Sequence, residues 1–140
     1  MPELNFTPEQ RAAIDTRGST VLVSAAAGSG KTRVLTERLM AYLTDAENPV
    51  DIDRFLVITY TRAAAAELRS RLLDGIYARI ASDPENRRLR RQVALCARAE
   101  IGTIHSFCAD FLRANCAALA LAPDFQVADT ERCAALRAAA

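Results

Sequence analysis

Residues 20–32, TVLVSAAAGSGKT, decide the fold of this chain. The run TVLVS over 20–24 is short, apolar and rich in β-branched residues, which predicts a buried strand. Gly28 and Gly30 then give a turn with little side-chain bulk, so successive backbone N–H groups can point toward one anion. Because Lys31 opens an amphipathic stretch, the order of strand, glycine turn and helix predicts a loop that holds phosphates at a helix N-terminus.

The end of this stretch carries side chains suited to a nucleoside triphosphate. Lys31 can reach the terminal phosphates, and the Thr32 hydroxyl can ligate Mg²⁺. The pattern departs from GxxxxGK[ST] at its first position, where Ala25 stands, which matters little if alanine can adopt the backbone angle there. A glycine turn with an incidental lysine and threonine is disfavoured, because strand, loop, Lys-Thr pair and amphipathic helix coincide.

Strands and helices alternate along the rest of the chain. The other predicted strands span 55–60 (FLVITY) and 100–104, with a short extended piece over 125–127. The predicted helices begin at Thr7-Pro8, at Lys31, after a cap at Thr61, at Asp83-Pro84, at His105 (to Ala118) and in the Ala-rich C-terminal stretch. This alternation predicts an α/β fold, with a parallel sheet flanked by helices.

Length and composition indicate one domain of a soluble protein. The 140 residues fit a single domain. No apolar run approaches the ~20 residues of a membrane span, and the N-terminus MPELNFTPEQ lacks a signal-peptide pattern. We therefore expect a cytoplasmic protein without membrane contact. Cys96, Cys108, Cys116 and Cys133 form no C-x-x-C pair, so buried free thiols are expected rather than a metal site.

Charge is distributed unevenly, although the net charge is only +1. Residues 61–120 carry ten basic and six acidic side chains, so this part could face a polyanion. The arginines of 87–91 follow Asp83 and Glu85, which favours a solvated, ion-paired helix face over a DNA track. Lys31 is the only lysine among 18 basic residues.

Four segments, in order, resemble motifs of UvrD/Rep-type superfamily 1 DNA helicases. They are the Q motif at 6–10 (FTPEQ), motif I at 25–32 (AAAGSGKT), motif Ia at 56–72 (LVITYTRAAAAELRSRL) and motif Ib at 101–113 (IGTIHSFCADFLR). Within that family, AAAGSGKT, TRAAAAE and IHSFC are most similar to the AddA subunits of AddAB helicase–nucleases, which process broken DNA ends for recombination. The resemblance spans essentially the whole chain and implies a P-loop NTPase (RecA-like) motor domain.

The resemblance implies a site for ATP and Mg²⁺. Gln10 would hydrogen-bond the adenine edge, or else merely close a capping box with Thr7, and both interpretations stay open. Arg33 would lie close to the nucleotide, or equally be a surface helix residue. Lys31 and Thr32 would be the catalytic residues, and Thr32 would ligate the Mg²⁺ that binds with ATP. The implied ATP-binding residues are Gln10, Ala25, Ala26, Ala27, Gly28, Ser29, Gly30, Lys31, Thr32 and Arg33.

The resemblance also implies contact with single-stranded DNA at the ends of two strands. Tyr60 would stack on a base, which is worth ~1–3 kcal/mol per base whatever the sequence. The alternative is that Tyr60 closes the hydrophobic end of its strand. A lone histidine is usually structural, but the position of His105 beside threonine and serine favours a DNA contact. The implied DNA-binding residues are Thr59, Tyr60, Thr61, Arg62, Thr103, His105 and Ser106.

Hydrolysis needs further groups that this sequence does not supply. A carboxylate must help to hold Mg²⁺, and another group must orient the attacking water. The stretch 125–129 (FQVAD) is a poor imitation of the Asp-Glu motif, which lies further along in the resembling family. We therefore expect residues 1–140 to form the N-terminal portion of a UvrD-like helicase ATP-binding domain, truncated before the Walker B motif, that turns over little or no ATP alone.

For the parent protein, the resemblance implies an ATP-dependent 3′–5′ DNA helicase or helicase–nuclease that acts in double-strand-break repair by recombination. Its partners would be single-stranded or duplex-end DNA and a second, AddB-like subunit. The alternatives are a UvrD- or PcrA-like repair helicase without a nuclease, and a non-catalytic nucleotide- or DNA-binding module. A complete small phosphotransferase is disfavoured, because the sequence offers no recognisable acceptor site.

Overall fold

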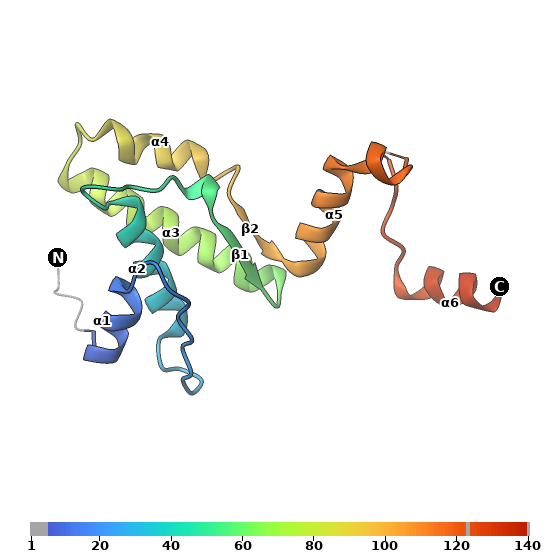
Figure 1. The fold of residues 1–140 in the computed structure, drawn as a ribbon, viewed down its shortest axis with the longest axis horizontal. Coiled ribbons are helices and arrows are strands. Elements are labelled where there is room, and N and C mark those ends of the chain that lie inside the picture. The colour runs from blue at the N-terminus through green and yellow to red at the C-terminus, as the bar shows by residue number, and fades with distance from the viewer. Residues whose placement is uncertain (1–5, 123, 140) are drawn as a thin grey trace.

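The chain folds as helices around a small parallel sheet. The structure, a computed structural model, describes residues 6–122 and 124–139. Its helices are α1 (Pro8–Asp15), α2 (Lys31–Leu43), α3 (Arg62–Ser82), α4 (Arg87–Leu95), α5 (Ile104–Ala114) and α6 (Thr130–Ala138), with short 3-10 turns η1 (Ile52–Arg54) and η2 (Cys116–Leu119). Its strands are β1 (Leu56–Thr59) and β2 (Glu100–Thr103). Figure 1 shows α1 to α4 gathered beside the strands, whereas α5 and α6 extend away from them.

The two strands form a parallel ladder, as the sequence predicted. Val57 pairs with Ile101, and Thr59 pairs with Thr103 at the carboxyl end of the ladder. Helix α3 follows β1 and packs on both strands, so the crossover between the parallel neighbours is helical. The expected α/β character is therefore confirmed, with each strand shorter than predicted.

The strand predicted over 20–24 is absent from the described residues. This run carries no regular secondary structure, and the Leu22 side chain is 92% exposed rather than buried. A strand is stabilised by a hydrogen-bonded neighbour, and none of the residues that the structure describes pairs with this run. The piece over 125–127, expected to be short and extended, carries no regular secondary structure.

The helix starts were predicted correctly where a local cap decides them. Thr7 forms a complete capping box with Gln10 at the start of α1, and the Thr61 hydroxyl accepts a hydrogen bond from the backbone N–H of Ala64 at the start of α3. The helix expected from Asp83-Pro84 begins later, because Asn86 is the residue that caps α4. The helix expected over 105–118 ends at Ala114 and gives way to η2.

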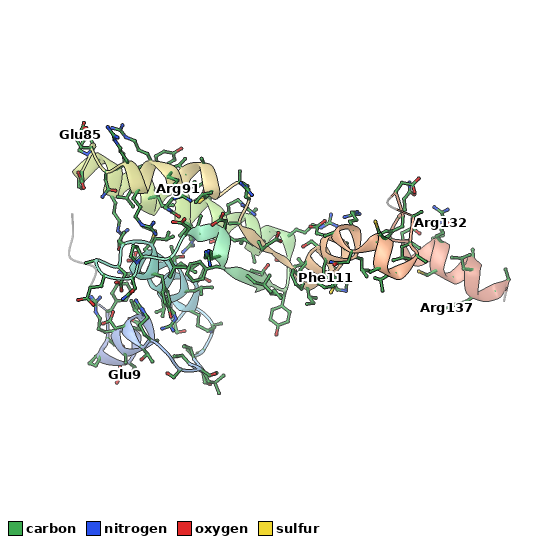
Figure 2. All side chains as sticks on the ribbon, turned by 45° about the horizontal axis from the view of Figure 1, so that its top comes forward. Glu9, Glu85, Arg91, Phe111, Arg132 and Arg137 are labelled. Carbon is green, nitrogen blue, oxygen red and sulfur yellow. The ribbon has the colours of Figure 1, made fainter. Side chains whose placement is uncertain are left out.

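Helix α3 supplies the centre of the core. Leu68, Leu72 and Ile76 recur every four residues on one face and are almost fully buried, which is the amphipathic spacing of a helix. Met40 and Leu43 of α2 belong to the same cluster. Figure 1 shows α4 and α2 on either side of α3. At the other end of the molecule, Arg132 and Arg137 lie on the α6 arm, far from Glu9 of α1 (Figure 2).

The arginine cluster on α4 is tied to the turn before β1. Arg88 and Arg91 form ion pairs with Asp51, at 2.8 and 3.1 Å. Gln92 is fully buried; its side chain donates to Asp51 at 2.8 Å and accepts from the backbone N–H of Ile52 at 2.9 Å. The predicted ion-paired face is confirmed for these two arginines, but their acidic partner is Asp51 rather than Asp83 or Glu85.

Asp51→Asn is expected to remove a pH-dependent part of the stability. The hydrogen bond from Gln92, together with Arg88 and Arg91, lowers the pKa of Asp51. A lowered native pKa stabilises the fold above the unfolded-state pKa of about 3.9, and this contribution is lost as the pH falls through the native value. The free energy of unfolding, measured by urea titration, should be higher for the wild type than for the variant at pH 6. This difference in free energy should shrink steadily below pH ~4.

Asp74→Asn is the matched control, because Asp74 is exposed on α3. It should follow the wild type at every pH. If the free energies of unfolding of wild type and Asp51→Asn differed by the same amount from pH 6 to pH 2, Asp51 would not be the source of the pH-dependent stability.

The four cysteines are less buried than the sequence predicted. Cys96 is buried, and desolvation raises its pKa, but Cys108 is exposed and Cys116 and Cys133 are half-buried, so the prediction of buried thiols holds only for Cys96. Helix α5 buries only Ala109 among its residues, so Cys108 stays exposed. Within 6–122 and 124–139, no three His, Cys, Asp or Glu side chains gather around a possible metal position. None of the described helices has the length and apolar character needed to cross a membrane.

Candidate nucleotide and DNA sites

The glycines of the phosphate loop are required by backbone geometry. Gly28 and Gly30 have φ of +77° and +85°, in the left-handed region that is costly for any residue with a Cβ. Among the described residues, the only non-glycine with positive φ is Ala120. Ala25 therefore occupies the first position of the motif without backbone strain.

Lys31 folds back over the loop that precedes it. Its Nζ donates to the carbonyl oxygens of Ala25 at 2.6 Å and Ala26 at 2.7 Å. Helix α2 begins at Lys31, and its N-cap, Gly30, offers no side-chain cap to the first N–H groups. An ammonium group beside uncapped N–H groups at a positive helix end is the arrangement that binds a phosphate. These residues therefore fit a triphosphate.

Gln10 joins helix α1 to the phosphate loop. Its Oε1 accepts from the backbone N–H of Thr7 at 3.0 Å, which completes the capping box, and its Nε2 donates to the carbonyl oxygen of Ser29 at 3.2 Å. The capping role is thus confirmed, while the adenine contact stays a prediction. The cavity between α1 and the loop is lined by Thr7, Glu9, Gln10, Ala13, Val23, Ser24, Ala25, Ser29, Lys31 and Val34.

The remaining predicted nucleotide residues are exposed around the first turn of α2. Thr32 and Arg33 both face solvent, as do Ala26 and Ala27. The Arg33 guanidinium carbon lies 4.7 Å from the centre of the Phe6 ring. Arg33 is thus a surface residue of the helix, which was one of the two predicted alternatives. It is also a neighbour of the Q-motif segment, and the sequence alone did not indicate that contact.

The turn after β1 is held by threonines and presents a tyrosine. The Thr59 hydroxyl lies within donating distance of the carbonyl oxygens of Thr61 (2.9 Å) and Gly102 (3.3 Å). Tyr60, between these threonines, is fully exposed. The alternative in which Tyr60 closes the hydrophobic end of the strand is therefore wrong. Arg62, the first residue of α3, is also exposed.

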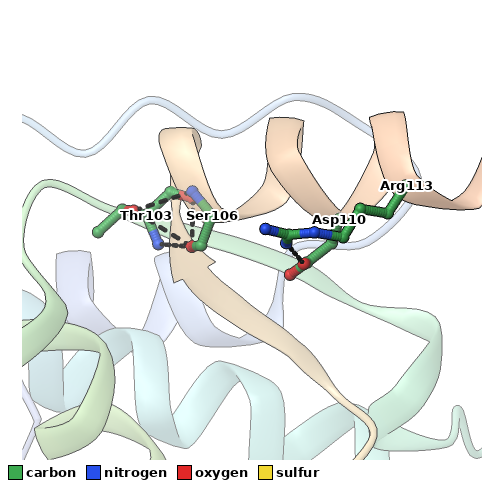
Figure 3. A network of polar contacts seen from close by, with 4 residues as sticks. All are labelled: Thr103, Ser106, Asp110 and Arg113. Atoms are coloured by element: carbon green, nitrogen blue, oxygen red, sulfur yellow. Dashed lines mark hydrogen bonds and ion pairs between the residues drawn. The ribbon is translucent and has the colours of Figure 1, made fainter. Parts of the chain in front are cut away.

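The start of α5 is held by a reciprocal cap (Figure 3). The backbone N–H of Thr103 donates to Ser106 Oγ at 2.9 Å, and the Ser106 N–H donates to Thr103 Oγ1 at 3.2 Å. Both hydroxyls are thus engaged within the fold, and His105, on the same turn, is exposed. Arg113 pairs with Asp110 on the next turns of the helix, at 2.9 Å (Figure 3).

Parallel pairing brings motifs Ia and Ib together. Thr59 and Thr103 are register partners, and Arg62, His105 and Ser106 line one cavity, whose other lining residues are Ala109, Asp110, Arg113, Phe125, Gln126 and Val127. This cavity shares no lining residue with the one that contains Gln10 and Lys31. The predicted residues thus fall into two separate groups, as a nucleotide site and a DNA site would require.

Comparison with known proteins shows the family of this chain. Residues 6–139 match the family model of the UvrD/REP helicase N-terminal domain. The chain belongs to the UvrD/REP helicase family. It is 52% identical over 125 residues to the AddA subunit of the ATP-dependent helicase/nuclease of Clostridium acetobutylicum, a match that covers 89% of this chain and 10% of that protein. The AddA subunit from Thermoanaerobacter pseudethanolicus is 52% identical over 124 residues, with the same coverage.

A third relative, the AddA subunit of the ATP-dependent helicase/nuclease of Clostridium beijerinckii, is 48% identical over 129 residues, or 92% of this chain and 10% of its own length. This UvrD/REP chain therefore spans about a tenth of the length of the curated relatives that it matches. The predicted resemblance to the family, and within it to AddA subunits, is confirmed.

Three side chains beside these sites were not identified from the sequence. The Phe6 ring contacts the guanidinium of Arg33. The guanidinium carbon of Arg113 lies 5.4 Å from the centre of the Phe125 ring. Arg69 of this UvrD/REP chain donates to the carbonyl oxygens of Ala99 and Ile101, both at 3.2 Å, and also to Cys96. The helical spacing of Ser106 and Arg113, two turns apart, could have indicated Arg113. The other two contacts are long-range.

Proposed function

We propose that this chain is the ATP-binding and single-stranded-DNA-contacting N-terminal part of an ATP-dependent 3′–5′ DNA helicase or helicase–nuclease. The observation that carries the proposal is the loop at 25–32, in which two left-handed glycines and Lys31 lead into the uncapped start of α2. The names of its relatives, which describe ATP-dependent helicase/nuclease subunits, favour a role in double-strand-break repair by recombination.

On the nucleotide side, each group has a definite task. The N–H groups around Gly28 and Gly30 and the Lys31 ammonium bind the phosphates, and the Thr32 hydroxyl ligates Mg²⁺. Mg²⁺ supplies charge neutralisation on the β- and γ-phosphates when it is bound. Gln10 reads the adenine edge with the Nε2 hydrogen that its bond to Ser29 does not use, while its Oε1 stays in the capping box. In this proposal, Lys31 exchanges the carbonyls of Ala25 and Ala26 for phosphate oxygens.

On the DNA side, the two strand ends offer a stacking face and cationic or polar groups. The exposed Tyr60 ring can stack on a base, and stacking on an aromatic face tolerates every sequence. Arg62 and His105, which line one cavity, can contact phosphates. Thr59 and Thr61 offer backbone groups to the DNA, whereas Thr103 and Ser106 shape the turn beside His105 through their reciprocal cap.

The proposal includes the setting of the chain. Residues 1–140 would be the N-terminal portion of a P-loop, RecA-like motor domain that lies before the Walker B motif. The complete protein would act in the cytoplasm on single-stranded DNA and duplex ends, together with an AddB-like partner. Binding of ATP would close this domain on a second motor domain and hydrolysis would reopen it, so that the strand moves between two grips.

Equilibrium binding tests the proposal directly. A fluorescent ATP analogue with Mg²⁺ and a labelled oligothymidine should each bind the 140-residue chain, at separate sites that can be filled together. Steady-state phosphate release with single-stranded DNA should stay near the rate without protein. The proposal would be overturned if the chain bound neither the ATP analogue nor the oligothymidine. Helicase-like turnover by this chain alone, abolished by Lys31→Ala, would overturn the view that further motor residues are needed.

A further inference from the structure

The cavity that contains His105 reaches beyond the residues that the motifs explain. Its volume is about 480 Å³. Arg62, the first residue of α3, and His105, on the first turn of α5, line one part of it. Arg113, about two turns further along α5, and the segment 125–127 line another part. The segment 125–127 lies outside the four motif segments, and neither it nor Arg113 has a task in the DNA site proposed above.

The guanidinium of Arg113 is held in this cavity from two sides. Its Nη1 donates to Asp110 Oδ1 at 2.9 Å, and its Cζ lies 5.4 Å from the centre of the Phe125 ring. A guanidinium near an aromatic face is attracted by the ring quadrupole. In Figure 3 the Arg113 side chain runs back along α5, toward the turn that carries Ser106. Arg113 is therefore directed to the same cavity as Arg62 and His105.

Arg113 keeps the capacity to bind an anion in this position. Its side chain is 48% exposed. Within the part of the chain that the structure describes, only one of its N–H groups donates a hydrogen bond. Among the described residues that line the cavity, Asp110 is the only acid, so the cations Arg62 and Arg113 outnumber it. A planar guanidinium can bind two phosphate oxygens at once, so a backbone phosphate of DNA fits this group.

We propose that Arg113 binds a backbone phosphate of the single strand, and that Phe125 is the positioning residue that holds the Arg113 guanidinium in the cavity. This inference rests on the proposed function of the two strand ends as a DNA site. It extends the DNA track along α5 by about two turns beyond His105. The contact carries no sequence information, because the phosphate is the same at every nucleotide.

The salt dependence of binding tests this contact, because each phosphate that a protein cation neutralises releases counterions. A labelled oligothymidine is titrated with the complete natural protein, without nucleotide, at several salt concentrations. Arg113→Met keeps the apolar stem and removes the charge. At ~50 mM salt it should bind DNA about 3- to 10-fold more weakly, and the slope of log affinity against log salt should become shallower by about 0.7. Arg113→Lys keeps the charge and should keep the wild-type slope.

Two controls separate the lost contact from other effects of removing an arginine. Arg71 is also half-exposed, at 50%, and also pairs within its own helix, with Glu67, but it does not line the cavity. Arg71→Met should therefore keep both the affinity and the slope. Arg113→Met also leaves the Asp110 carboxylate unpaired, which could repel DNA. In the background of Asp110→Asn, Arg113→Met should still weaken binding and still reduce the slope.

The role of Phe125 is tested through Arg113. Phe125→Leu keeps apolar packing but loses the ring, so it should weaken DNA binding about 2- to 4-fold. In the background of Arg113→Met, the same change should cause no further loss, because a positioning residue acts only through the group that it holds. Phe125→Tyr keeps the ring and should bind DNA like the wild type.

The outcomes distinguish this inference from the function beneath it. The phosphate contact would be overturned by an unchanged slope in Arg113→Met, by an equal change in Arg71→Met, or by a loss that vanishes in Asp110→Asn. A loss from Phe125→Leu that persists in Arg113→Met would overturn the positioning role. In each of these cases, a weakened Tyr60→Ala would leave the proposed DNA site standing. If the wild type did not bind oligothymidine, the DNA site itself would fall, and the role of Arg113 with it.

Discussion

Lys31→Ala is expected to weaken binding of Mg²⁺-ATP about 30- to 150-fold, because losing a charged hydrogen-bond donor to an anion costs ~2–3 kcal/mol. Lys31 is the only lysine of the chain, and its Nζ already lies over the loop, 2.6 Å from the carbonyl oxygen of Ala25. The alanine variant keeps the helix and the glycine turn and removes the ammonium together with its aliphatic stem. Fluorescence anisotropy of a labelled ATP analogue gives the affinity.

Two companion variants make this result specific. Lys31→Arg keeps the positive charge but replaces a compact ammonium by a planar fork, so we expect it to bind ATP poorly as well. Arg71→Ala removes an exposed cation that pairs with Glu67 on α3 and should bind ATP like the wild type. Wild-type affinity in Lys31→Ala, with the fold intact by circular dichroism, would refute the assignment of this loop.

Tyr60→Ala is expected to weaken binding of single-stranded DNA about 5- to 150-fold, which is the affinity equivalent of ~1–3 kcal/mol per stacked base. The Tyr60 side chain is fully exposed, so its removal leaves no cavity, and the free energy of unfolding should change little. Tyr60→Phe should retain nearly all of the affinity, because stacking uses the ring and not the hydroxyl. Titration of a labelled oligothymidine at fixed salt gives these values.

Tyr77 provides the matched control for Tyr60. It is another exposed tyrosine, 55% accessible on α3, and lies outside both predicted sites. Tyr77→Ala should therefore bind DNA like the wild type. Equal losses in Tyr60→Ala and Tyr77→Ala would indicate non-specific contact, and no loss in Tyr60→Ala would remove the stacking role.

Local signals in the sequence predicted the local parts of the fold. The starts of α1 and α3 were found because Thr7 and Thr61 cap them with their own side chains. The prediction of a strand over 20–24 was wrong because a strand depends on a hydrogen-bonded neighbouring strand. A helix cap depends only on residues within one turn. The run is apolar enough for a strand, yet its residues lie unpaired among those that the structure describes.

The candidate sites followed the same division. Motif spacing identified the loop residues and the two strand ends, and pairing of β1 with β2 brings those ends together. The contacts between Phe6 and Arg33, and between Asp51 and the arginines of α4, join segments far apart in the sequence. A single sequence carries no signal for such pairs, because each partner alone is an ordinary aromatic or charged residue.

The bonds of Arg69 have a mechanical consequence. This one guanidinium, on α3, holds the carbonyls of Cys96, Ala99 and Ile101, just ahead of the turn that carries His105. The Thr59 hydroxyl, at the end of β1, also lies 3.3 Å from the carbonyl oxygen of Gly102 in β2. The two strands are thereby tied to each other and to α3 as one block, and Tyr60 and His105 lie just beyond its carboxyl end. If a nucleic-acid strand bound at both Tyr60 and His105, it would move together with this block. Any stretching between the two contacts would then occur in the nucleic acid rather than in the protein.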